Sequence, residues 1–146
     1  MSGSYATDIL VWSEEQATLL RRLATGDRVN DQVDWQNVIE EIESVGNEQL
    51  HAVRSLFTQA IIHRLKVMAW PQARDADNWH AEAQRFAGDA GDRFAPSMRQ
   101  RLDLAQIYRR ALRAVPATMY GEPRPGLPAE CPWSLDELLG NEDDAA

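Results

Sequence analysis

The stretch DWQNVIEEIES, residues 34–44, opens the longest helical pattern in the sequence. Asp34 is a good N-cap, because its side chain can accept a hydrogen bond from a backbone N–H of the first turn. The pattern runs to about Trp70, where Pro71 stops it. With successive residues about 100° apart, one largely apolar face emerges, built from Trp35, Ile39, Ile42, Gln49, Val53, Leu56, Phe57, Ala60, Arg64 and Val67. The sequence therefore predicts one long central helix.

Gly46 falls within this face and leaves the continuity of the helix open. Glycine weakens a helix by roughly 1 kcal/mol relative to alanine, so Gly46 marks either a break or a close approach of another helix. Beyond Leu56 a second apolar sector appears, made of Ile61, Ile62, Leu65, Met68 and Ala69. A helix that is apolar on most sides is covered on most sides. We therefore expect IIHRLKVMAW at the centre of the core, with its second sector covered by the chain itself or by a second copy.

Shorter helical patterns flank the long one, at residues 13–24, 77–88, 96–115 and 134–139. Ser13 with Gln16 has capping-box spacing, after a short turn that Asp8 can cap, and Ser134 with Glu137 repeats this spacing. The segment YGEPRPGLPAECPW is rich in proline and glycine, which predicts an extended, turn-rich connection.

The predicted fold is all-α: a small up-and-down helical bundle with one long central helix and a proline-rich C-terminal wrap. A chain of 146 residues suits one domain. We expect a single helical domain over residues 1–146, ordered over about residues 5–139, with a disordered acidic tail at residues 140–146.

Charge and composition exclude several functions. The net charge of -8 repels phosphate backbones, so nucleic-acid binding is not expected. No apolar run is long enough for a membrane span, and the N-terminus lacks a basic region followed by a hydrophobic stretch. We therefore expect a cytoplasmic protein that does not enter the membrane.

Cofactor motifs are missing from the sequence. The single cysteine, Cys131, excludes an internal disulfide and every zinc site built from several cysteines. There is no phosphate-cradling glycine loop, no G-x-S-x-G elbow and no dinucleotide-binding fingerprint. We expect no cofactor and assign no metal site.

The acidic cluster of the long helix supplies the candidates for chemistry. Glu40 and Glu43 lie three residues apart and are neighbours on a helix, whereas Glu41 points away from both and is expected in solvent. His63 follows about five turns later, roughly 30 Å along the helix, and shares a site with Glu43 only if the chain reverses at Gly46. Glu40, Glu43 and His63 are thus weak catalytic or metal-binding candidates. A histidine bonded to a carbonyl is the commoner explanation for His63.

Structural roles compete with this interpretation. Arg101 is expected on the apolar side of its helix, where an unpaired guanidinium is costly, so a Glu43–Arg101 or Glu43–Arg54 ion pair is the structural alternative. The same predicted helix carries the one basic face of an acidic protein, a candidate interaction face for an acidic partner or the protein's own tail: Arg99, Arg109, Arg110 and Arg113.

Four stretches together resemble a known family. They are YATDILVWSEEQATLLR, DWQNVIEEIESVG, the HRLK run before Pro71, and LPAECPWSLDELL. They resemble the bacterial Domain of Unknown Function family 29 over nearly the whole chain, from about Tyr5 to Leu139. The resemblance implies an all-helical protein and carries over no established activity or catalytic residue.

Two functional hypotheses remain. The first is a non-enzymatic protein-interaction or regulatory module that works through a helix face, with an unknown protein partner or as a homodimer. The second is a metal-dependent or hydrolytic, nuclease-like enzyme that uses Glu40, Glu43 and His63. The sequence favours the first, because His63 lies far from Glu40 and Glu43 on one helix.

Overall fold

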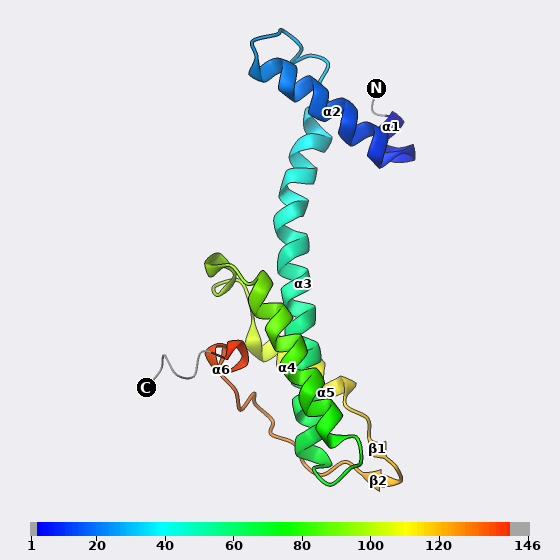
Figure 1. The fold of residues 1–146 in the computed structure, drawn as a ribbon, viewed down its shortest axis with the longest axis vertical. Coiled ribbons are helices and arrows are strands. Elements are labelled where there is room, and N and C mark those ends of the chain that lie inside the picture. The colour runs from blue at the N-terminus through cyan, green and yellow to red at the C-terminus, as the bar shows by residue number, and fades with distance from the viewer. Residues whose placement is uncertain (1–2, 141–146) are drawn as a thin grey trace. The chain divides into compact units, whose positions relative to one another are not determined.

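The computed structural model describes residues 3–140 and is mainly helical, with an extended segment between α5 (Leu104–Ala114) and α6 (Leu135–Leu139) (Figure 1). The chain divides into two compact units, Met1–Glu48 and Gln49–Ala146. The long helix α3 (Trp35–Ala69) supplies residues to both. The predicted all-α class with one long helix is confirmed. None of the helices in the described range has the length and apolar character of a membrane span.

In the first unit, α1 (Gly3–Thr7) and α2 (Ile9–Ala24) precede the start of α3. Asp8 is the N-cap of α2, and its side chain accepts a hydrogen bond from the Val11 N–H at 3.1 Å. The predicted helix start at Ser13 is wrong. Ser13 lies inside α2, where its hydroxyl donates to the Leu10 carbonyl. Asp8 begins the helix earlier because a carboxylate already satisfies the first free N–H groups there.

The first unit has a small core with a polar clamp. Trp12, Val33 and Val38 are buried together. The Trp12 indole N–H donates to the Asp34 carboxylate at 3.0 Å, and the Asp34 backbone N–H donates to the side-chain oxygen of Gln16 at 2.8 Å. Gln16 is only 6% exposed, so this hydrogen bond satisfies a buried amide. The clamp ties α2 to the first turn of α3.

Helix α3 continues through Gly46 without a break. No atom would lie within 4 Å of a Cβ added at Gly46, so the glycine marks no close approach of another helix. The end of α3 at Ala69, before Pro71, is as predicted. The 35-residue helix tolerates one glycine because its cost of about 1 kcal/mol is small beside the packing of the remaining turns.

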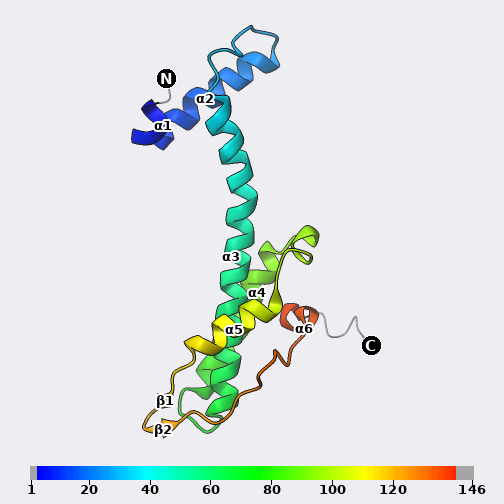
Figure 2. The ribbon, with the colours of Figure 1, turned by 180° about the vertical axis from the view of Figure 1, so that it is seen from behind.

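In the second unit, Figures 1 and 2 show α4 (Ala76–Arg93) and α5 (Leu104–Ala114) beside the C-terminal half of α3. Helix α4 runs past Gly88, where the sequence pattern predicted its end. The predicted helix at residues 96–115 is two elements. A 3-10 turn, η1 (Pro96–Met98), comes first, and α5 begins only after Asp103, whose side chain accepts from the Gln106 N–H.

The core of this unit joins α3 to α5. Phe57, Ile61 and Leu65 are fully buried, and Ile107 and Tyr108 pack in the same cluster. Both apolar sectors of α3 contribute to it. Most of the second apolar sector is therefore covered by the chain itself. A second copy is not needed to bury these residues.

The proline-rich segment is held against the core of the second unit. It begins with a hairpin of two short strands, β1 (Thr118–Met119) and β2 (Glu122–Pro123). Tyr120 and Gly121 turn the chain with φ angles of 53° and 78°, a pair of left-handed residues typical of a tight hairpin. Further on, the Tyr108 hydroxyl donates to the Pro128 carbonyl. We call residues 124–133 the strap.

Helix α6 (Leu135–Leu139) closes the described chain and lies against α4. Ser134 caps it as predicted, accepting from the Glu137 N–H at 3.1 Å. Leu138 is buried in the core of the second unit. The disordered tail was predicted from residue 140. Gly140 is the C-cap of α6, and residues 141–146 lie outside the described residues.

Candidate functional site

The largest unexpected feature is an exposed apolar row on the first turns of α3. We call it the α3 stripe: Trp35 (44% exposed), Ile39 (51%), Ile42 (67%) and Val45 (62%). The sequence pattern predicted this face to point into the core. In the second unit it does so, because Val53 and Phe57 on the same face are completely buried. In the first unit the face lies in water.

Acidic side chains border the α3 stripe. Glu40, Glu43 and Glu48 are exposed around it, and no lysine, arginine or histidine occurs between residues 35 and 48. Residues 1–48 contain ten acidic and three basic side chains, a net charge of -7, so nearly all of the chain's net charge of -8 lies in the first unit. The α3 stripe is thus an apolar surface in a negative field.

The three glutamates of the opening stretch have different surroundings. Glu41, expected in solvent, accepts a hydrogen bond from the Tyr5 hydroxyl at 2.6 Å. This hydrogen bond raises the pKa of Tyr5, because it holds the proton on the phenol. The negative charge of Glu41 raises the pKa further, because it disfavours the phenolate. Glu40 and Glu43 are exposed. It is therefore Glu41 that braces the first unit, by tying the N-terminal segment to α3.

His63 belongs to the second unit, whereas Glu40 and Glu43 belong to the first. The His63 Nδ1 donates to the Gln59 carbonyl at 2.8 Å, and its ring lies 5.3 Å from that of Phe86. This hydrogen bond to a backbone carbonyl matches the commoner explanation for His63 given by the sequence. Within residues 3–140, no group of three His, Cys, Asp or Glu side chains is arranged to hold a metal ion. The enzyme hypothesis stays a prediction without a supporting contact in this range.

The structure removes the reason for which a Glu43–Arg101 ion pair was predicted. Arg101 precedes α5 and is exposed, so its guanidinium does not lie on an apolar helix side and needs no carboxylate partner. Arg54 and Arg101 belong to the second unit and Glu43 to the first. The Glu43–Arg101 and Glu43–Arg54 pairs stay predictions.

The predicted basic face is smaller than expected. Arg99 lies before α5 and pairs with Asp136 at 2.8 Å, so it does not share a helical face with the others. Arg109, Arg110 and Arg113 are exposed on α5 itself. Arg99 was expected on this face because the sequence predicted one continuous helix over residues 96–115. The sequence pattern does not reveal the turn at residues 99–103.

Two of these arginines meet a third from α3. Arg54, Arg110 and Arg113 line one pocket of about 510 Å³, whose other walls are Thr58, Gln106 and the buried Ile107. Arg54 and Thr58 are one turn apart on α3, and Gln106, Arg110 and Arg113 follow one face of α5. We call it the arginine pocket. The sequence does not reveal this pocket, because nothing in either helix alone shows that these two faces oppose each other.

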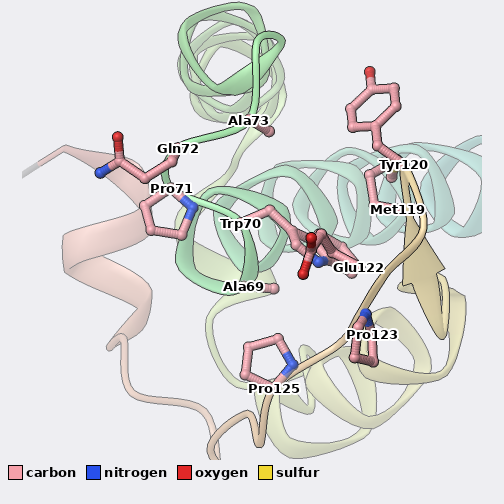
Figure 3. Close-up of a pocket in the computed structure, with 10 residues that line it drawn as sticks. All are labelled: Ala69, Trp70, Pro71, Gln72, Ala73, Met119, Tyr120, Glu122, Pro123 and Pro125. Carbon is pink, nitrogen blue, oxygen red and sulfur yellow. The ribbon is translucent and has the colours of Figure 1, made fainter.

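A second pocket lies where α3 ends (Figure 3). It measures about 530 Å³, and Trp70, Tyr120, Glu122, Pro123 and Pro125 are among its walls. The Trp70 indole N–H is buried without a hydrogen-bond partner. Because that N–H is itself covered, the pocket offers a ligand an apolar wall and no free donor at this position.

The single cysteine has a structural role. The Cys131 thiol donates to the Trp133 carbonyl at 3.2 Å within the strap. Burial raises the pKa of Cys131, which keeps the sulfur as the less reactive thiol.

The fold and surfaces together define a helical protein with an exposed apolar helix face, the α3 stripe, and an arginine-lined pocket. The family model of the Domain of unknown function DUF29 matches residues 4–142, so the chain belongs to this family. It is similar to an α-helical protein of unknown function from Rhodospirillum rubrum, known from a crystal structure, with a TM-score of 0.69 and 31% sequence identity. That match covers 92% of this chain and 88% of the other. A comparison with curated proteins found no match.

Proposed function

We propose that the protein is a non-enzymatic interaction module that binds a partner through the α3 stripe. The single observation that supports this is the exposure of Trp35, Ile39, Ile42 and Val45 on one helix face. Exposed single apolar residues are common, but a continuous row of large ones is typical of a docking surface. Apolar residues at this spacing fit the helix-in-groove mode, in which two helices bury their apolar faces together.

The charges around the α3 stripe favour a basic amphipathic helix from another protein as the partner. Lysine or arginine beside its apolar residues would face Glu40, Glu43 and Glu48. A second copy of this chain would instead bring carboxylates against carboxylates in either helix orientation, because residues 35–48 carry no basic side chain. Like charges across an interface weaken binding and exclude wrong partners.

The test uses the full chain and two synthetic helical peptides with the same leucine face, one with lysines and one with glutamates on the polar face. We expect the lysine peptide to bind and the glutamate peptide not to bind. Fully burying an isoleucine contributes about 1.5–3 kcal/mol. Because Ile42 is 67% exposed, Ile42→Ser should cost ~1–2 kcal/mol of binding, about a 5- to 30-fold rise in Kd.

Met68→Ser is the matched control, because Met68 is an exposed apolar residue (42%) outside the α3 stripe. Its substitution should leave binding unchanged. Light scattering on the unmodified chain separates the outcomes. A dimer that Ile42→Ser dissociates would keep the interaction function but replace the basic partner with a second copy. A monomer that binds neither peptide would contradict the proposed function.

A further inference from the structure

We infer that the arginine pocket is a binding site for a phosphoryl group, carried by a small phosphorylated molecule or present as a free phosphate or diphosphate. This inference is independent of the α3 stripe, which lies in the other unit. It begins from three guanidinium groups, those of Arg54, Arg110 and Arg113, around one pocket. Gathering like charges is unfavourable unless an anion enters among them.

Within residues 3–140, no carboxylate is paired with the three guanidinium groups. The ion pairs within residues 3–140 join Arg22, Arg74, Arg85 and Arg99 to carboxylates, and none involves an arginine of the pocket. Arg54 and Arg110 also line an adjoining hollow of about 130 Å³, so their side chains converge from α3 and α5 over more than one opening. Among the described residues these three guanidinium groups have no carboxylate partner, so each can present its N–H fork to a ligand.

The number of arginines favours a phosphoryl group over a carboxylate. A guanidinium presents its N–H groups as a planar fork that matches the oxygens of a phosphate or a carboxylate. One carboxylate has two oxygens and a single charge, which one arginine satisfies. A phosphate monoester has three terminal oxygens and up to two charges, which suit two or three arginines. The side-chain amide of Gln106 adds a neutral donor at the same rim.

The rest of the pocket fits a small ligand. Its volume of about 510 Å³ lies within the range of small-molecule sites. Ile107 is 2% exposed and belongs to the core, so this wall of the pocket is part of the packed core. Thr58 donates its hydroxyl to the Arg54 carbonyl at 2.8 Å, which fixes its rotamer and leaves the oxygen as an acceptor for a ligand hydroxyl.

The test is calorimetric titration of the full chain with inorganic phosphate, diphosphate and a nucleoside diphosphate, with sodium chloride at equal ionic strength as the blank. We expect diphosphate or the nucleotide to bind. Arg110→Gln should raise the Kd roughly tenfold or more, because a charge-assisted hydrogen-bond pair is lost. Arg109→Gln is the matched control, since Arg109 is exposed on the same helix and does not line the pocket.

Each outcome decides the inference. Binding that is weakened by Arg110→Gln and by Arg54→Gln, but not by Arg109→Gln, supports a built phosphoryl site. An equal loss of binding affinity in Arg109→Gln and Arg110→Gln would show only diffuse charge attraction and would overturn the inference. The absence of binding heat with every phosphate-bearing probe would also overturn it. Tighter binding of the nucleoside diphosphate than of diphosphate would identify an organic phosphate as the ligand. Circular dichroism of each variant verifies the fold.

Discussion

The hydroxyl of Tyr108 fastens the strap to the core, and Tyr108→Phe tests this contact with the least disturbance. The side chain is 1% exposed, and its hydroxyl donates to the Pro128 carbonyl. Phenylalanine keeps the ring and leaves no cavity, so only the hydrogen bond is removed. The net contribution of such a bond is about 0.5–1.5 kcal/mol. We expect Tyr108→Phe to lower the free energy of unfolding by about 1 kcal/mol and Tyr108→Ala to lower it by about 3–5 kcal/mol.

The measurement is urea unfolding followed by circular dichroism, with limited proteolysis of the native protein as a local probe. Tyr108→Phe should open the strap and speed cleavage within residues 124–133, while α3 stays protected. A variant that unfolds at the same urea concentration and shows unchanged cleavage would refute the fastening role. In that case, packing alone would hold the strap.

The same contact has a pH signature. Burial raises the pKa of Tyr108 above the ordinary value of 10.0. A raised folded-state pKa means that the contribution to stability is complete below the unfolded pKa of about 10 and is lost as pH rises through the folded pKa. The unmodified chain should therefore lose stability above about pH 10 more steeply than Tyr108→Phe. Equal slopes would contradict the burial of an ionisable hydroxyl.

Three further predictions follow from single contacts. Hydrogen bonds from Asn37 and Trp12 lower the pKa of Asp34, so Asp34 contributes stability above its unfolded pKa of about 4. That contribution is lost as pH falls through the folded pKa, and melting curves of Asp34→Asn should depend less on acid. Gly46→Ala has open space around the new methyl group and should raise the free energy of unfolding by about 0.5–1 kcal/mol in urea titrations. Phe57→Ala empties a fully buried position and should cost about 3–5 kcal/mol in the same assay.

Local signals in the sequence were sufficient for the limits of α3. Asp34 precedes its first residue, and Pro71 follows soon after its last. Both act through their immediate neighbours on the backbone, so no tertiary information is needed to interpret them. The same is true of Ser134, whose hydroxyl caps α6 as its spacing from Glu137 predicted.

The predicted helix at residues 96–115 shows where local signals are insufficient. Pro96 suits a first helical turn, and one does form as η1. Burial of Met98 and the cap at Asp103 then turn the chain before α5 begins. The spacing of apolar residues stays close to the helical period through this turn, so the sequence pattern does not reveal it. Arg99 and Arg101 were consequently assigned to a helix face that does not exist.

The arginine pocket depends on tertiary structure for the same reason. Arg54 stands 56 positions before Arg110 in the sequence, and each lies on a helix whose polar face is ordinary when considered alone. Only the tertiary core that contains both Phe57 of α3 and Ile107 of α5 brings these two faces together. A helical period identifies a face but contains no information on the face that it will meet.

The α3 stripe follows from the same principle. The period of 3.6 residues predicted that the face of Trp35, Ile42 and Val53 is buried, without defining what buries it. Val53 is covered by this chain, whereas Ile42 is 67% exposed. Folding of the described chain gains little from a large apolar side chain in water, so Ile42→Ser should hardly change the free energy of unfolding. If Ile42→Ser leaves stability unchanged but weakens peptide binding, the apolar residues of this face serve to bind a partner. If the variant is less stable, they serve the chain's own core.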